Sequence, residues 1–148
     1  MQLRPATADD FAAIVRLLDE VSLNATDLNP AHTAAFLLLC DADRLLACGA
    51  VERFEDRAGL VRSVAVAPTH RGQGLATRIM RSLETHARHR GIDRLFLLTQ
   101  TAAGFFARLH FARCERERAP EAMRASSQFA GLCPGTAVCM CKDLRQSV

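Results

Sequence analysis

A short segment of the chain combines residue types that suit the binding of a phosphate group. Residues 64–76 read as a strand, a turn containing Gly72 and Gly74, and the start of a helix. Glycine has no side chain and adopts unusual backbone angles, so successive N–H groups can point at one anion, which the positive end of the helix dipole also attracts. The segment therefore predicts a pyrophosphate site. The alternative is a glycine turn that serves only the strand-to-helix geometry, because such short motifs are weak by themselves.

Six cysteines form a second group of residues that could do chemistry. Cys139 and Cys141 alternate along one predicted strand, so both sulfurs face the same side, and Cys133 precedes them. Thiolates in that arrangement favour trivalent arsenic or a soft metal ion. The alternative is that these cysteines are small core residues of a protein in a reducing compartment. No C-x-x-C pair occurs, so the cysteines do not predict a zinc site.

The elements that must position these residues are strands and helices in mixed order. Helical spacing of apolar residues predicts helices over 7–21, 75–90 and 101–109, and 120–134 reads as a helical insertion. Apolar runs bounded by turns predict strands over 3–5, 34–40, 45–54, 60–67, 94–99, 111–118 and 137–144. Thr7 and Asp10 are spaced like a helix-capping pair, and Gly91 stands where a left-handed helix C-cap is expected. A helical connection predicts that the strand at 94–99 is parallel to the strand at 60–67.

Length and composition favour one globular domain, residues 1–148, in a chain of 148 residues with 49% hydrophobic residues. The net charge is +3, and the positive residues are scattered among acids, which disfavours a nucleic-acid partner. Apolar runs are far shorter than the about 20 residues that cross a bilayer, and the first residues lack a signal-peptide core, so a cytoplasmic location without a membrane partner is expected. The assembly state is open, with a homodimer as one alternative.

The turn also carries a family resemblance. Residues 71–76 match the R/Q-x-x-G-x-G/A coenzyme A signature of the GNAT family of N-acetyltransferases. The surrounding strand, proline turn and helix, the start at Arg4-Pro5-Ala6-Thr7, and the segment 105–111 resemble that family in order and spacing. The resemblance implies an α/β fold with a mixed sheet of about seven strands, splayed between the fourth and fifth strands and flanked by helices.

The same resemblance implies acetyl-CoA as co-substrate of an acetyltransferase, bound where the strand at 64–66 diverges from the strand at 95–99. The implied cofactor-binding residues are Val64, Ala65, Val66, Arg71, Gly72, Gln73, Gly74, Leu75, Ala76 and Thr77. Acetyl transfer is then direct. The acceptor amine must lose a proton to a base, and the tetrahedral oxyanion needs an N–H donor. The backbone N–H of Val66, or of a neighbour, is the candidate donor. No metal is implied.

The chain departs from the family pattern at the expected acid and base. Many relatives place a tyrosine four residues before the glycine of a G-F pair, whereas this chain has Phe106 and His110 at those positions and no tyrosine anywhere. The acid is therefore unassigned: another group protonates the CoA thiolate, or the thiolate leaves unassisted into water. Phe106 is expected in the core and His110 in a loop. Where relatives carry an early carboxylate in the fourth strand, this chain has Leu60 and Val61.

Four residues remain as candidates for the chemistry. Glu52 is the candidate base, on the strand face of Cys48 and Ala50, a face that could border the cleft. Its alternative role is an ion pair across the hairpin. Ser63 is the second catalytic candidate; Arg62 and Thr99 are the substrate-binding candidates. Arg62 could fork onto an acceptor carboxylate or arsonate-like group or serve as a cross-strand partner, and the hydroxyls of Ser63 and Thr99 could merely satisfy backbone groups.

A narrower resemblance concerns the acceptor. The second half of the chain resembles the acetyltransferases encoded in bacterial arsenic-resistance operons, at residues 97–99, 105–106, Pro120, 129–134 and 139–140. This implies a small-molecule amine acceptor, such as an arsenic- or phosphorus-containing amino acid. Two other functions stay open: a thiol-based protein that binds arsenicals or soft metals, and a GNAT enzyme that acts on a protein or peptide amine.

Overall fold

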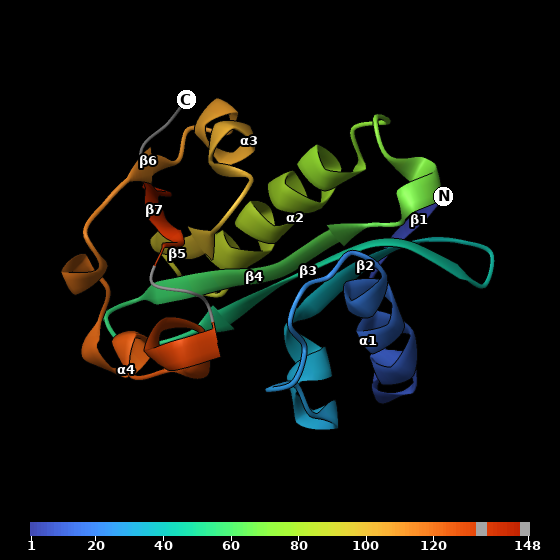
Figure 1. Cartoon of the computed structure of the whole chain (residues 1–148), viewed down its shortest axis with the longest axis horizontal. Helices are drawn as coiled ribbons and strands as arrows, with labels where there is room; N and C mark the ends of the chain where they lie inside the picture. Colours follow the sequence, from blue (N-terminus) through green and yellow to red (C-terminus); the bar gives the residue numbers. More distant parts are fainter. Residues whose placement is uncertain (133–135, 146–148) are drawn as a thin grey trace. The chain divides into compact units, whose positions relative to one another are not determined.

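The computed structural model describes residues 1–132 and 136–145 and has a mixed α/β fold built on a seven-stranded sheet (Figure 1). The strands follow the order β1-β2-β3-β4-β5-β7-β6. They are β1 (Gln2–Pro5), β2 (Phe36–Asp41), β3 (Arg44–Arg53), β4 (Ala58–Val66), β5 (Arg94–Thr99), β6 (Ala112–Arg113) and β7 (Val138–Asp143). β4 and β5 are parallel, which confirms the mixed sheet and the parallel pair predicted from the sequence.

The helices are α1 (Phe11–Glu20), α2 (Leu75–His89), α3 (Ala103–Arg108) and α4 (Glu121–Arg124). Short segments of tighter or wider helix lie at Ala8–Asp10, Pro30–Ala35, Pro68–His70, Arg116–Arg118 and Gln128–Leu132, the last interrupted by the non-helical backbone of Gly131. In the described ranges, no helix has the length and apolar character needed to cross a membrane.

The chain forms two compact units, and each is described by itself. The first unit comprises Met1–Val51 and Ser63–Thr85, and the second comprises Glu52–Arg62 and His86–Val148, described outside 133–135 and 146–148. The end of β4 and the start of α2 therefore belong to the first unit. The strands β5, β6 and β7 belong to the second unit.

The core of the first unit lies between α1 and its strands. Helix α1 buries Ile14, Leu17 and Leu18, whose spacing places them on one helical face. Cys48 and Ala50 of β3 are fully buried in the same cluster. The face of β3 that carries these two residues is therefore a core face at these positions.

Helix α2 packs closely over β3 at Gly49. A Cβ atom at Gly49 would lie 2.8 Å from Cγ2 of Ile79 and 2.9 Å from Cδ1 of Leu83, both on α2. Real Cβ atoms do not approach carbon so closely, so the glycine allows the helix to sit against the strand. This contact positions α2, and with it the turn that precedes the helix.

The second unit has its own apolar cluster. Ala58 and Leu60 of β4, Phe96 of β5, Ala119 and Met123 are all buried in it. Phe106 of α3 is 7% exposed and packs edge-to-face on the Phe105 and Phe111 rings. The prediction that Phe106 is a core residue is confirmed.

Two local predictions need correction. The strand predicted over 111–118 is only β6, and residues 116–118 form a helical turn instead. The reason is that β7 begins at Val138, so pairing runs out once Cys114 is bonded to Cys139, and the following residues are consecutively charged. The insertion predicted over 120–134 is helical only at α4 and at Gln128–Leu132, and its last two residues lie outside the described part of the chain.

Candidate active site

The turn between β4 and α2 has the backbone conformation predicted from its glycines. Gly72 has φ 78° and Gly74 has φ 76°, in the left-handed region that favours glycine. A Cβ atom at either position would meet no atom within 4 Å, so the backbone angle, and not crowding by this chain, is the reason for glycine. The space beside the turn is therefore open to a ligand.

Helix α2 begins directly after this turn. Its first intrahelical hydrogen bond runs from the Arg78 N–H to the Gly74 carbonyl oxygen, at 3.1 Å. The first N–H groups of an α-helix have no partner within the helix, and they form the positive end of its dipole. Arg71 is exposed at the same turn and adds a guanidinium charge. These groups together can bind a pyrophosphate through backbone N–H donors and one cation.

Ser63 has an unusual conformation inside β4. Its φ is 58°, although it is not glycine, and its carbonyl oxygen accepts a hydrogen bond from the Cys48 thiol at 3.3 Å. Burial raises the pKa of Cys48 to about 12, so this thiol stays protonated and can donate. A left-handed residue inside a strand is typical of a β-bulge, which re-aims the groups that follow it. Those groups are the predicted CoA-binding residues Val64, Ala65 and Val66.

The structure brings Glu52 and Arg62 together as an ion pair. The distance from Arg62 Nη1 to Glu52 Oε1 is 3.3 Å, with 3% of the Arg62 side chain and 25% of the Glu52 side chain exposed. This is the hairpin ion pair that the sequence offered as the alternative to a catalytic base. The Arg62 side chain is buried and already paired with Glu52. An acceptor anion would therefore have to share the Arg62 guanidinium group with the Glu52 carboxylate.

Thr99 ends β5, and its hydroxyl has a structural partner. The Thr99 Oγ1 atom accepts a hydrogen bond from the Ala102 N–H at 3.0 Å, just before α3. This is the backbone-satisfying role that small hydroxyl residues often have. Its side chain helps to start α3, and a contact with substrate would be an additional role.

Pairing between β4 and β5 covers only part of each strand. Residues 58–60 pair with 94–96, and residues 97–99 of β5 pair with β7. The register between the parallel strands thus ends at Leu60 and Phe96. The divergence of the fourth and fifth strands beyond this register stays a prediction.

One departure from the family pattern is visible in the backbone. His110 has φ 72°, in the left-handed region, at the position where the family pattern has glycine. It is exposed and lies in the loop after α3, as predicted. No pattern in the sequence indicates the position of Cys114, whose sulfur lies 3.6 Å from the sulfur of Cys139. Cys133 lies outside the described residues.

Comparison with known sequences gives one family and several distant relatives. The acetyltransferase (GNAT) family model matches residues 5–111. The amino-acid acetyltransferase of Ralstonia nicotianae is 28% identical over 129 residues, which are 82% of this chain and 29% of that protein. That of Pseudomonas putida is 29% identical over 131 residues, which are 84% of this chain and 30% of that protein. The chain thus spans about 30% of the length of these curated relatives.

Solved structures share the fold. N-acetylglutamate synthase from Neisseria gonorrhoeae, in complex with coenzyme A and L-arginine, aligns with a TM-score of 0.84 at 23% identity, over 98% of this chain and 33% of that chain. Rv2747 from Mycobacterium tuberculosis, in complex with CoA and NLQ, aligns with a TM-score of 0.80 at 24% identity, over 97% and 99%. The family model covers more than half of the chain, including the glycine turn. The chain therefore belongs to the acetyltransferase (GNAT) family, whose enzymes use acetyl-CoA as co-substrate.

Proposed function

We propose that this chain is an acetyl-CoA-dependent N-acetyltransferase that acts on the α-amino group of an amino acid. The observation that carries the activity is the turn before α2, where Gly72 and Gly74 both have positive φ and open space beside them. The relatives named amino-acid acetyltransferase and N-acetylglutamate synthase support the acceptor class. This support comes only from the roughly one third of each relative's length that this chain matches.

The turn and β4 supply the proposed acetyl-CoA contacts. The N–H groups of residues 72–76 donate to the pyrophosphate, and Arg71 adds positive charge. Gln73, Leu75 and Thr77 complete the turn and the first helical residues. The backbone of residues 64–66, re-aimed after the left-handed Ser63, pairs with the pantetheine arm.

The proposed reaction is a direct transfer. The neutral acceptor amine attacks the thioester carbonyl carbon, so a C–N bond forms while the carbonyl oxygen becomes an oxyanion. The N–H of Val66, or of a neighbour, stabilises that oxyanion. The C–S bond then breaks with its electron pair on sulfur. The amine proton passes to a base, for which Glu52 is the candidate, and the CoA thiolate takes a proton from water.

Arg62 and Thr99 are the proposed acceptor contacts, and Ser63 is proposed as a polar group beside the reacting atoms. A guanidinium fork suits a carboxylate, a phosphonate or an arsonate. An arsenic- or phosphorus-bearing amino acid is the narrower acceptor proposed within this class, and it rests on the sequence resemblance in the second half of the chain. A cytoplasmic location, the lack of a nucleic-acid partner and a homodimer remain predictions.

A CoA-release assay across acceptors tests the proposal. CoA is separated by chromatography, because the six cysteines of the protein would react with a thiol dye. The panel contains glutamate and other α-amino acids, arsenic- and phosphorus-bearing amino acids, a polyamine and a lysine peptide. We expect turnover with an α-amino acid and none with its N-acetylated form, which is the matched control. Preference for the peptide or polyamine over every amino acid would contradict the acceptor class, and failure to bind acetyl-CoA would contradict the activity.

A further inference from the structure

Two cysteines from different strands face each other in the second unit. In the antiparallel register of β6 and β7, Ala112 pairs with Cys141 and Arg113 pairs with Met140. The next pair is Cys114 with Cys139, since the Cys114 N–H donates to the Cys139 carbonyl oxygen at 3.0 Å. Side chains directly opposite each other on paired strands lie on the same face of the sheet. Their sulfur atoms are 3.6 Å apart.

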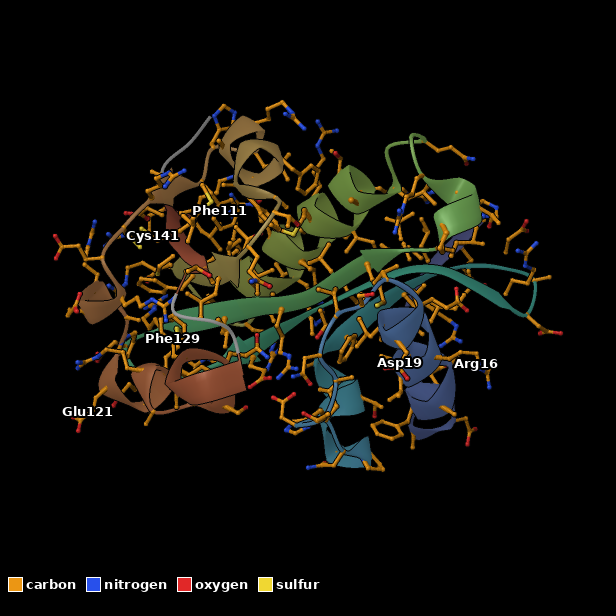
Figure 2. All side chains as sticks on the ribbon, viewed as in Figure 1. Arg16, Asp19, Phe111, Glu121, Phe129 and Cys141 are labelled. Carbon is orange, nitrogen blue, oxygen red and sulfur yellow. The ribbon has the colours of Figure 1, made fainter. Side chains whose placement is uncertain are left out.

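The cysteine pair lies beside an apolar cluster, with the charged groups of Arg116 and Glu117 also acting on Cys139, and Cys114 is only partly buried. Cys114 and Cys141 are partly buried and pack against the cluster around Leu60, Phe96 and Met123 (Cys141 and the nearby Phe129 are labelled in Figure 2). Cys139 is 5% exposed. Burial raises the pKa of both the Cys114 and the Cys139 thiols, so both are protonated at neutral pH. The pair is therefore a poor nucleophile, and a ligand must displace two protons to bind it.

We propose that Cys114 and Cys139 form a two-thiol chelating site for a soft metal ion or metalloid, separate from the acetyl-CoA turn. Metal–thiolate bonds of about 2.3 Å at tetrahedral angles place two sulfurs about 3.8 Å apart. The separation of 3.6 Å is close to that value, so one ion can bridge both sulfurs without a change of strand register. Thiolates select soft ions over hard ones such as magnesium or calcium.

The site is assigned to this pair and not to a larger cluster. Cys141 also contacts Cys114, but it stands opposite Ala112, two register positions from the Cys114–Cys139 pair and on the same face of the sheet. Within residues 1–132 and 136–145, no group of three or more His, Cys, Asp or Glu side chains is arranged to hold a metal ion. The proposal therefore assigns a two-thiol site to Cys114 and Cys139, and the Cys141→Ala variant tests whether the third thiol on this face takes part.

Phenylarsine oxide is the probe, because it forms a stable cyclic adduct only with two thiols at once. Its As=O bond and two S–H bonds break, two As–S bonds form, and the two protons leave with the oxygen as one water molecule. Arsenic stays trivalent, so no oxidant or reductant takes part. Reagent enters at the more accessible Cys114, and the second bond forms to Cys139.

Intact-protein mass spectrometry of the full chain measures the adduct. We expect one phenylarsine group per chain, reversed by an added dithiol but not by the same concentration of a monothiol. Cys114→Ala and Cys139→Ala should each lose the adduct. Cys141→Ala, and Cys40→Ala from the first unit, should keep it as matched controls. No adduct on the native chain, or an adduct that survives in Cys114→Ala or Cys139→Ala, would overturn the proposal.

Peptide mapping of the native adduct covers the case in which a variant fails to fold. Cleavage after Arg113 and Arg116 releases Cys114 on a peptide of its own. We expect arsenic to link this peptide to the peptide 125–142, which carries Cys133, Cys139 and Cys141, and fragmentation of the linked peptides to place the second As–S bond on Cys139. Arsenic confined to the latter peptide would show that Cys114 takes no part and would overturn the assignment.

Discussion

The smallest structural features that matter for function are the backbone angles of single residues. Gly72 and Gly74 hold left-handed conformations in the turn before α2, and Ser63 holds one inside β4. Each stands next to N–H groups that the proposed reaction uses. A Cβ atom at Gly74 would meet no atom within 4 Å among the described residues other than its chain neighbours, so its effect on ligand binding can be separated from its effect on packing.

Gly74→Val should abolish acetyl-CoA binding. A β-branched residue resists φ 76°, and its side chain would occupy the space proposed for the pyrophosphate. A thermal-shift titration measures this: acetyl-CoA at 100 times its Kd should stabilise the native protein by about 2.7 kcal/mol. Gly104→Val, at a glycine without positive φ, should keep the shift as the control. A full ligand-induced shift in Gly74→Val would show that the pyrophosphate lies elsewhere.

Glu52→Gln separates the two roles offered for Glu52. If Glu52 is the base, kcat should fall by about 100-fold or more, because the amine would lose its proton acceptor. If Glu52 only pairs with the buried Arg62, stability should fall while kcat stays near the native value. Glu55→Gln is the control, because Glu55 accepts a backbone bond from Ala122 at 2.8 Å and an amide oxygen preserves that bond. We expect the loss of kcat. An unchanged kcat would show that Glu52 is not the base.

At the scale of elements, the junction of β1 and α1 is held by one carboxylate. The Asp10 carboxylate accepts two hydrogen bonds from the Arg4 guanidinium, both at 2.8 Å, and one from the Thr7 N–H at 2.7 Å. The hydrogen bonds from Arg4 lower the pKa of Asp10 from 3.8 to about 2. The predicted capping role of Asp10 thus includes a cation from the preceding strand.

This junction predicts an acid-sensitive contribution to stability. Because the pKa of Asp10 is lower in the folded state, its contribution is complete above pH 3.8 and is lost as the pH falls towards about 2. Asp10→Asn should therefore cost about 1 kcal/mol at neutral pH, with the difference from the native chain shrinking below pH 4. Urea unfolding at several pH values measures it. Asp9→Asn, at an exposed neighbour, should show no such trend, and a pH-independent loss in Asp10→Asn would contradict the ion-pair origin.

At the scale of the whole molecule, we predict that the acetyl transfer does not use the thiols. Burial raises the pKa values of Cys48, Cys114 and Cys139, and thiols held protonated are poor nucleophiles. The transfer should therefore proceed without an acetylated cysteine. Native protein incubated with acetyl-CoA and no acceptor should show an unchanged intact mass. An acetyl group on a cysteine, lost when that cysteine is replaced by alanine, would show a two-step mechanism instead.

The start of the chain and the segment from the glycine turn to the end of α2 could be predicted from the sequence because their signals are local. The apolar spacing of α2, its left-handed cap at Gly91 with φ 79°, and the two glycines before it all lie within one short stretch of chain. The capping pair Thr7 and Asp10 is likewise only three residues apart. Backbone conformation at these positions depends mainly on neighbours in the sequence, so residue types alone were sufficient.

Only the tertiary structure decided the features that depend on distant pairing. β7 lies between β5 and β6, which ends the predicted strand 111–118 early and places Cys114 opposite Cys139. Likewise, the burial of Arg62 beside Glu52 follows from how the hairpin packs and not from the alternation of its residues. The sequence by itself determined the family, the glycine turn and the main elements. Strand order, side-chain burial and thiol separation were decided by long-range contacts, because residues far apart in the chain carry no periodicity that records which of them will pair.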